Sequence, residues 1–324
     1  MKTAFKKYTV AALALVTIVF ISCEDADDNG NIIDPNNSAY DLTETNTDLS
    51  ILNTALIQTG LDATLDSQGT YTVFAPNNAA FNQYFTANGY ANIEAVPIAD
   101  LRAILLYHVI NAEVTSDLLS TGYVKTLGKD EEVEALDLFI EATTPVVLNG
   151  SAHVTQADIE VDNGVVHIID GVLDLPTIAT LIAANPEFSN LETALLQQGL
   201  EITLSNTNGT MQDPFTLFAP TDDGFQALIA LDPMDGLTNL QDILDLTNLT
   251  DILLYHVVGN ERIRSGDISN GLVIDPITAG TFSIDTMSGI VITDAQMTQA
   301  NITATNVTAV NGVIHTLDIV IRPM

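Results

Sequence analysis

The spacing of hydrophobic residues along the chain alternates between two periods. Leu49, Leu52, Leu56 and Ile57 recur at every third or fourth position and stop at Gly60, which predicts an amphipathic helix with a glycine C-cap. A second helix is predicted over residues 98–107. Short β-branched runs bounded by Gly, Asn or Pro predict strands, and they cover residues 72–75, 145–148, 151–156, 159–161 and 165–169. Helices come early and strands late, which predicts an α+β domain with a mostly antiparallel sheet.

Four blocks of sequence occur twice, in the same order. The pairs are "DLSILNTALIQTGLDATL" (48–65) with "EFSNLETALLQQGLEITL" (187–204), "YTVFAPNNAAF" (71–81) with "FTLFAPTDDGF" (215–225), "ILLYHVI" (104–110) with "ILLYHVV" (252–258), and "NGVVHIIDGVL" (163–173) with "NGVIHTLDIVI" (311–321). The offset between copies grows only near residues 205–214 and 232–236, which are rich in turn residues, as insertions in loops do. We therefore predict two copies of one domain, residues 40–176 and 177–324, preceded by segments 1–22 and 23–39.

The second pair of blocks has a direct physical interpretation. Phe74 and Phe218 are predicted to enter the core. Pro76 and Pro220 end the strand, and Asn77 or Thr221 begins the next helix as its N-cap. Phe81 and Phe225 then fall on the buried face of that helix. These positions are interpreted as folding determinants.

The repeated blocks resemble the fasciclin domain family. The resemblance rests on "TVFAPNNAAF" and "TLFAPTDDGF", the Tyr-His pairs, and the closing "NGVVHIID" and "NGVIHTLD", and it covers roughly residues 40 to 324. It implies two tandem fasciclin-like domains, each a wedge-shaped mostly antiparallel β-sandwich with helices packed along one edge, and a role in extracellular adhesion. Gly224 before Phe225, and Thr316 in a normally apolar strand position, depart from the family pattern and affect packing rather than fold.

The N-terminus predicts a bacterial lipoprotein signal peptide. Three lysines precede an apolar run of about 14 residues that ends before Ser22 and Cys23, which is shorter than a membrane span. The position of Cys23, the one cysteine of the chain, resembles a lipobox, in which the thiol is acylated. Two or more acyl chains suffice for stable membrane anchoring. Plain secretion and a retained transmembrane helix are the alternatives.

Residues 24–38 are acidic and rich in turn residues, which predicts a flexible tether. Acidic residues directly after a lipidated cysteine resemble signals that send lipoproteins to the outer face of the outer membrane. Residues 25–32 also fit the first eight positions of an EF-hand calcium loop, but Asn36 stands where a bidentate Glu belongs. The calcium loop, the export signal and a plain linker all remain open. We expect a location in the cell envelope, lipid-anchored at the outer membrane and exposed on its surface.

The charge of the chain excludes one class of partner. Without residues 1–22, six basic residues face 42 acidic ones, a formal charge of −36. A nucleic acid would be repelled by such a surface.

The histidines are predicted to be mainly structural. In strand alternation His167 and His315 share a face with aliphatic neighbours, which favours core residues with hydrogen-bonded ring nitrogens. His108 and His256 follow a helix end, where an imidazole can cap carbonyls. Burial with a satisfied hydroxyl is expected for Tyr107 and Tyr255. The fasciclin resemblance links this Tyr-His neighbourhood to receptor adhesion, so Tyr107, His108, Tyr255 and His256 are the candidate interaction residues.

No metal site, cofactor or catalytic site is predicted. His153 has Asn301 as its counterpart, and the sequence contains no His-x-His or Cys-x-x-Cys spacing. Asp170 and Asp318 lie three residues after His167 and His315, on the opposite side of the strand, so each pair would not converge. No nucleophile elbow or glycine-rich phosphate loop occurs.

The sequence thus predicts a lipid-anchored, non-catalytic adhesion protein. Its partner would be an extracellular protein or polysaccharide, and weak homo-association is left open. The alternative is a surface carbohydrate-binding accessory lipoprotein, which would need an aromatic stacking platform. The absence of Trp and the aromatic content of 6% supply such a platform poorly.

Overall fold

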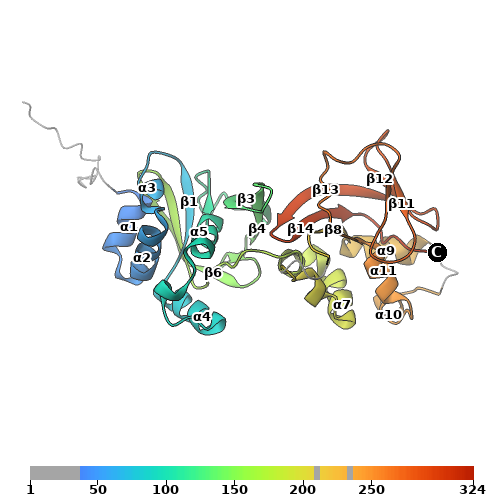
Figure 1. Cartoon of the computed structure of the whole chain (residues 1–324), viewed down its shortest axis with the longest axis horizontal. Helices are drawn as coiled ribbons and strands as arrows, with labels where there is room; N and C mark the ends of the chain where they lie inside the picture. Colours follow the sequence, from blue (N-terminus) through green and yellow to red (C-terminus); the bar gives the residue numbers. More distant parts are fainter. Residues whose placement is uncertain (1–36, 208–211, 232–235) are drawn as a thin grey trace, which may run out of the picture. The chain divides into compact units, whose positions relative to one another are not determined.

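The computed structural model describes residues 37–207, 212–231 and 236–324. Cys23, the signal segment 1–22, the calcium-loop segment and the tether up to residue 36 lie outside the described residues. Residues from Ser38 onward form one compact unit, in which two domains of the same architecture follow each other, here named repeat 1 and repeat 2 (Figure 1).

The two repeats present the same order of elements, with helices first. Repeat 1 contains α1 (Ala39–Thr45), η1 (Thr47–Leu49), α2 (Ser50–Thr59), α3 (Asp62–Leu65), β1 (Tyr71–Pro76), α4 (Asn78–Asn88), η2 (Ile93–Ala95), α5 (Ile98–Tyr107), β2 (Val109–Ile110), β3 (Gly122–Lys129), β4 (Ala135–Glu141), β5 (Val147–Leu148), β6 (Ala152–Val161) and β7 (Gly164–Ile169). Repeat 2 contains α6 (Ile178–Ala184), η3 (Pro186–Phe188), α7 (Ser189–Gln198), α8 (Glu201–Leu204), β8 (Phe215–Pro220), α9 (Asp222–Leu231), α10 (Leu240–Leu244), α11 (Leu249–Tyr255), β9 (Val257–Gly259), β10 (Leu272–Ile274), β11 (Phe282–Asp285), β12 (Val291–Thr293), β13 (Gln299–Ala309) and β14 (Gly312–Leu317).

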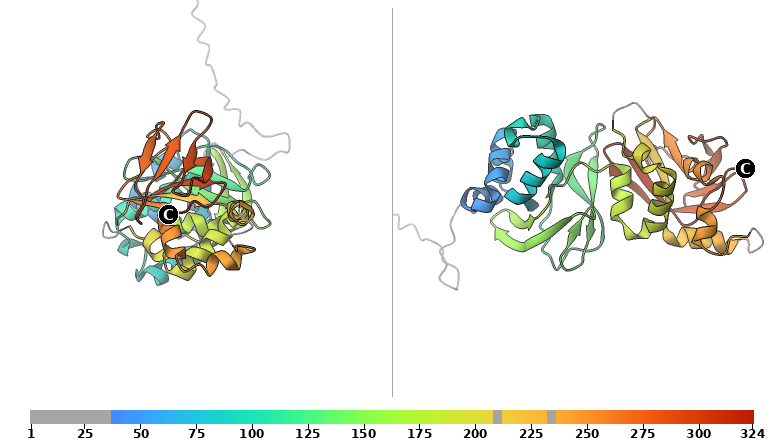
Figure 2. Two further views of the ribbon diagram at one scale, coloured as in Figure 1. Left: turned by 90° about the vertical axis from the view of Figure 1, so that its right-hand side faces the viewer. Right: turned by 90° about the horizontal axis from the view of Figure 1, so that it is seen from below.

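Each repeat has one seven-stranded sheet, in the orders β2-β1-β7-β6-β5-β4-β3 and β10-β11-β12-β13-β14-β8-β9. Its helices lie along one side of that sheet (Figure 2). Phe74 of β1 and Ile169 of β7 share a hydrophobic cluster with Leu138 of β4 and Leu148 of β5, although neither β1 nor β7 is hydrogen-bonded to β4 or β5. The sheet therefore folds over on itself, and the predicted α+β fold with a mostly antiparallel β-sandwich is confirmed.

Each sheet contains one parallel pair of strands, β1 with β7 and β8 with β14, and the pair lies next to the short edge strand β2 or β9. Val73 and Val166 pack in the cluster that contains the helices, whereas Phe74 and Ile169 pack in the cluster on the other face. Such a strand pair is covered on both faces, as parallel strands usually are.

The two predicted helices are confirmed, since α2 ends at Gly60 with φ 65° and α5 covers residues 98–107. Asn77 caps α4 by accepting a hydrogen bond from the Ala80 amide. The strands predicted at 151–156 and 159–161 are wrong in one respect, because they form the single strand β6 with two register shifts. The strands β3 and β4 were not predicted.

Among the helices in the described part of the chain, none is long and apolar enough to cross a membrane.

The glycine of the "NGVVH" block is required by the parallel pair. A Cβ at Gly164 (φ 136°) would lie 1.9 Å from the Tyr71 carbonyl oxygen, whereas a Cβ at Gly122 (φ 148°) would meet nothing within 4 Å. We expect Gly164→Ala to lower the free energy of unfolding by about 3 kcal/mol or more, because strands β1 and β7 must separate. Gly122→Ala carries the same backbone strain without the clash and serves as control. Equal losses in urea denaturation of the two variants would contradict the explanation.

Candidate functional site

His167 and His315 lie inside the core, between the two sheet layers and the loop that follows β2 or β9. Both are fully buried, and each stacks on the phenylalanine opposite it in the parallel pair: Phe74 at 5.5 Å and Phe218 at 5.4 Å between ring centroids. His167 Nε2 donates to the Val114 carbonyl at 3.0 Å, and its Nδ1 accepts from the Asp158 amide at 3.2 Å. His315 Nε2 donates to the Ile263 carbonyl at 2.7 Å.

His108 and His256 connect a helix end to the chain beyond the last strand. His108 Nδ1 donates to the Ile104 carbonyl at 2.7 Å, and its Nε2 accepts from the Leu173 amide at 2.9 Å. His256 makes the same two contacts, to Ile252 at 2.7 Å and Ile321 at 3.1 Å. One nitrogen donates and the other accepts, so each ring is neutral. Burial lowers the pKa of both histidines to about 4.

The four candidate interaction residues are buried, which corrects the idea that they contact a partner directly. Tyr107 and Tyr255 have no exposed surface, and His108 and His256 have 2% and 1%. The Tyr107 hydroxyl donates to the Asp137 carbonyl at 2.8 Å, and that of Tyr255 to the Thr281 carbonyl at 2.7 Å. Their side chains hold strands in place and offer no surface to another molecule.

Asp170 and Asp318, which follow His167 and His315 by three residues, accept hydrogen bonds from the neighbouring strand rather than from the histidines. Asp170 accepts from the His153 amide at 2.6 Å, and Asp318 accepts from the Asn301 amide at 2.7 Å and its side-chain amide at 2.6 Å. His153 and Asn301 are thus equivalent positions. Neither aspartate joins His167 or His315 in a site.

Ser116, Asp158 and His167 have the residue types of a hydrolytic triad, but their order in space is wrong for one. The Asp158 carboxylate lies in the middle, bonded to the Ser116 hydroxyl and 3.9 Å from His167 Nδ1. His167 Nε2 is engaged by a backbone carbonyl. The serine therefore has no imidazole to take its proton, as nucleophilic catalysis requires. In repeat 2 Asn306 takes the place of the aspartate, accepting from the Ser265 amide at 2.8 Å and donating its side-chain amide to the Ser265 hydroxyl at 2.6 Å.

No group of three or more His, Cys, Asp or Glu side chains is placed to hold a metal ion within the ranges that the structure describes.

The two repeats meet through a buried carboxylate. Asp137 of β4, whose side chain is 5% exposed, accepts from Lys125 Nζ at 2.5 Å and from the Thr308 amide of repeat 2 at 2.6 Å. Lys125 also donates to the Thr308 hydroxyl and the Asn306 carbonyl, both at 3.1 Å. Burial raises the pKa of Asp137, and Lys125 and the Thr308 amide oppose that rise. One lysine and one aspartate of repeat 1 therefore hold the bulged strand β13 of repeat 2.

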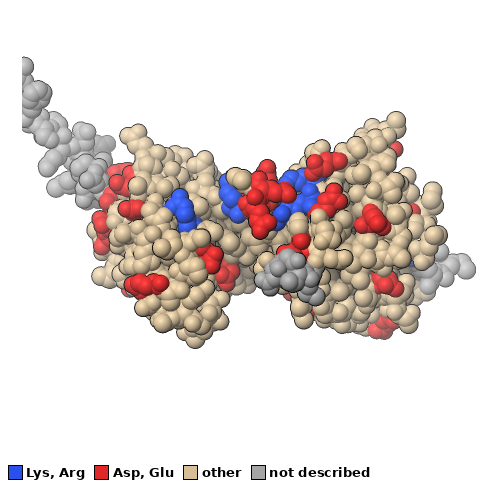
Figure 3. All heavy atoms as spheres, in the orientation of Figure 1, with Lys and Arg blue, Asp and Glu red and all other residues tan. Residues whose placement is uncertain are grey.

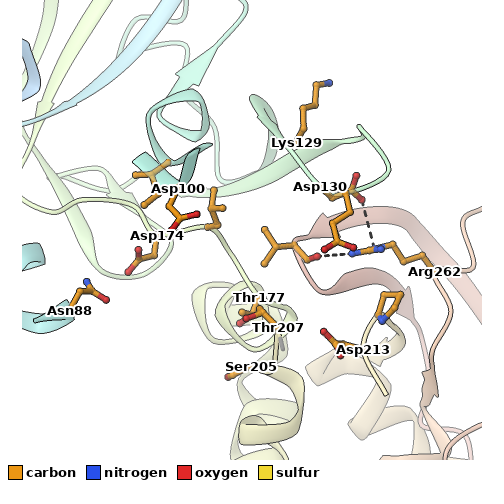
Figure 4. A pocket seen from close by; sticks show the side chains of 15 residues that line it. Asn88, Asp100, Lys129, Asp130, Asp174, Thr177, Ser205, Thr207, Asp213 and Arg262 are labelled. Carbon is orange, nitrogen blue, oxygen red and sulfur yellow. Dashed lines mark hydrogen bonds and ion pairs between the residues drawn. The ribbon is translucent and has the colours of Figure 1, made fainter. Parts of the chain in front are cut away.

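A second set of charges lies nearby, where Arg264 of repeat 2 donates to Asp130 at 2.7 Å and to Glu132 at 3.0 Å. The Arg262 guanidinium lies 3.8 Å from Asp130 and donates to the Val310 carbonyl at 2.6 Å (Figure 4). Basic side chains on the face drawn in Figure 3 gather at its middle, beside acidic ones. Four of the six basic residues beyond position 22 belong to this junction: Lys125, Lys129, Arg262 and Arg264.

Two open cavities adjoin the junction. The larger, of about 1160 Å³ and here named the charged cavity, is lined by acids together with Lys129 and Arg262 (Figure 4). The second, of about 610 Å³, is here named the tyrosine cavity. Its lining is Thr121, Gly122, Tyr123, Phe139, Asn185, Pro186, Glu187, Thr221, Asp222, Asp223, Thr303, Ala304, Val307 and Thr316.

Sequence reasoning did not find the junction. One feature of the sequence indicates it: four of the six basic residues beyond position 22 fall in two short segments, 125–129 and 262–264.

Comparison with known proteins gives matches over both repeats. A family model described as the fasciclin domain matches residues 47–176 and 186–323. Human periostin is 26% identical over 269 residues, which cover 80% of this chain and 29% of periostin. Transforming growth factor-beta-induced protein ig-h3 of Sus scrofa is 29% identical over 147 residues, 44% of this chain and 20% of that protein. The chain thus spans less than a third of the length of either animal protein.

Bacterial proteins and a solved structure also match. An uncharacterized Synechocystis protein is 34% identical over 125 residues, 38% of this chain and 87% of that protein. The solved structure is a FAS1 domain pair from the insect cell adhesion molecule Fasciclin I. It has a TM-score of 0.52 and 22% identity, and the match covers 84% of this chain and 96% of that chain. The fold of the pair is therefore that of tandem fasciclin domains.

The buried neutral histidines predict a pH-dependent stability. Their pKa is about 4 when folded and about 6.5 when unfolded, so the unfolded state binds more protons between these values and stability falls as pH falls through that window. Between pH 7 and pH 5 we expect a loss of up to about 2 kcal/mol for each of the two histidines. Urea denaturation at several pH values measures it. His153→Gln removes an exposed histidine and should leave the pH dependence of the free energy of unfolding unchanged. A free energy of unfolding that stays constant from pH 7 to pH 5 would contradict the prediction.

The junction predicts a difference between two lysines of the same strand. Lys125→Met leaves the Asp137 carboxylate buried without its cation, so we expect a loss of about 1 to 3 kcal/mol in the free energy of unfolding. Lys129→Met removes the same charge from an exposed side chain and should change it by less than about 0.5 kcal/mol. Thermal and chemical unfolding of both variants make the comparison. A similar effect of the two substitutions would show that net charge, not the Asp137 contact, is responsible.

Proposed function

The chain belongs to the fasciclin domain family, and from this membership we propose that it is a non-catalytic adhesion protein that presents two fasciclin domains outside the cell. The observation that carries the proposal is that both repeats match the family and that the pair has the fold of a domain pair from a cell adhesion molecule. Its partner is an extracellular protein or polysaccharide.

The geometry of the repeated motifs supports a binding role rather than catalysis. His108, His167 and His256 use both ring nitrogens in hydrogen bonds to the backbone. Proton transfer to a substrate needs a ring nitrogen within reach of it. Contacts with a partner must therefore come from the exposed loops and the cavities at the junction.

We further propose that the chain is lipid-anchored through Cys23 at the outer membrane. Acylation would place many copies on one surface, with residues 24–38 as a spacer. Under that arrangement weak individual contacts combine, because a second contact forms at a high effective concentration once the first has formed.

Cys23 also provides the test, since it is the one thiol of the chain. Protein covering residues 23–324 is coupled through Cys23 to maleimide-lipid vesicles, and its retention is measured on immobilised matrix proteins and polysaccharides, with and without calcium. We expect densely coupled vesicles to be retained about a hundredfold more strongly than the free protein. A Cys23→Ser protein mixed with the same vesicles is the control. Equal retention of free and coupled protein on every surface would contradict adhesion by multivalent contact.

A further inference from the structure

We propose that the tyrosine cavity binds a cationic side chain, that of Lys or Arg, presented by a partner protein. The proposal rests on the proposed function only for the source of that side chain. It is argued from the charge, the shape and the sequence differences of the cavity.

The charge of the cavity is unbalanced. Glu187, Asp222 and Asp223 line it, and no basic residue does, whereas the charged cavity contains Lys129 and Arg262. Asp222 is already engaged by the Ser189 hydroxyl at 2.7 Å and the Asn190 amide at 2.8 Å. Glu187 and Asp223 are exposed, and their carboxylates have no ion pair or hydrogen bond among the described residues. Two carboxylates are therefore available to a cation from outside.

The wall of the cavity suits the aliphatic part of such a side chain. The Tyr123 ring is half-buried and packs edge-on against Phe139, with 5.0 Å between centroids. Its hydroxyl donates to the Leu181 carbonyl at 2.9 Å, so the ring is fixed. A Lys or Arg stem can lie along Tyr123 and Ala304 while its charge reaches the carboxylates, and an aromatic face attracts a cation further. A volume of about 610 Å³ is ample for one such side chain and the peptide backbone that carries it.

Two of the differences between repeat 2 and repeat 1 lie at this cavity. Asp223 stands where repeat 1 has Ala79, and Thr316 stands where it has the buried Ile168. Both replace an apolar residue by a polar one, and both line the tyrosine cavity. Asp222, by contrast, replaces Asn78, which bonds Ser50 and Ile51 much as Asp222 bonds Ser189 and Asn190. Repeat 2 therefore places two polar side chains at the cavity where repeat 1 has apolar ones.

The test uses two peptides that differ in one charge. The ¹⁵N-labelled protein of residues 23–324 is titrated with acetyl-Ser-Arg-Ser-amide and with the same peptide carrying citrulline, which is neutral and nearly equal in shape. We expect amide shifts at Tyr123, Thr303 and Thr316 with the Arg peptide, and about fivefold weaker binding of the citrulline peptide.

Matched variants then assign the binding to the cavity. Glu187→Gln with Asp223→Ala should weaken binding of the Arg peptide about fivefold, and Ala is the residue that repeat 1 already has. Asp48→Asn with Glu113→Gln, which removes two charges from exposed positions of repeat 1, should leave it unchanged. Unfolding midpoints confirm that both variants fold.

Three results would overturn the proposal: no shifts at the cavity, equal binding of the two peptides, or shifts with the neutral disaccharide cellobiose alone, which would make this a sugar site. Because the titration needs no anchor and no adhesion partner, its failure leaves the vesicle result standing. If the Arg peptide binds but the vesicles are not retained, only the proposed adhesion function is contradicted, and the cation site stands.

Discussion

The one parallel pair of buried strands in each sheet imposes the constraint on which the rest of the repeat depends. A parallel pair cannot be joined by a tight turn, so the whole chain from Pro76 to Gly164 must leave β1 and return beside it. Both strands of the pair are buried because helices cover one of its faces and the folded-over sheet covers the other. The imidazole of His167 is held at this strand pair because its ring stacks on Phe74 while both of its nitrogens bond backbone groups of the returning chain. An aliphatic side chain would fill the space but leave those backbone groups unsatisfied, which costs more than an apolar contact returns.

The two repeats meet at a polar pair of side chains that repeat 1 supplies. In the antiparallel register of repeat 1 Lys125 lies opposite Asp137, and the two side chains form an ion pair. A buried ion pair is weak evidence for stability, because desolvation offsets much of its attraction. Its effect here is on geometry, since Asp137 accepts one particular amide, that of Thr308, which fixes the register between β4 and β13.

The sequence predicted the helices and strands that depend on interactions between residues close together in the chain. The helix over residues 98–107 was predicted from the sequence, and the strands β1 and β7 follow from their short β-branched runs, which are buried almost throughout. Asn163 shows the limit of this reasoning, since "NG" indicates only a turn. Its buried side chain accepts from the Ala39 amide and donates to the Leu65 and Ser67 carbonyls, all about a hundred residues away. The junction was unpredictable for the same reason, because Asp137 sits in the apolar run "ALDLFIE" and its partner is remote in sequence.

The distribution of charge bears on what such a pair can adhere to. Of the six basic residues beyond position 22, Lys125, Arg262 and Arg264 are paired with carboxylates at the junction, so few cations are left for a second copy. Contact between identical copies would bring acidic surfaces together within a Debye length of about 8 Å, where screening by salt is incomplete. Self-association is thereby disfavoured relative to a partner that brings its own positive charge. Complementary charge of this kind speeds encounter and selects partners more than it adds affinity, which is consistent with the multivalent adhesion proposed above.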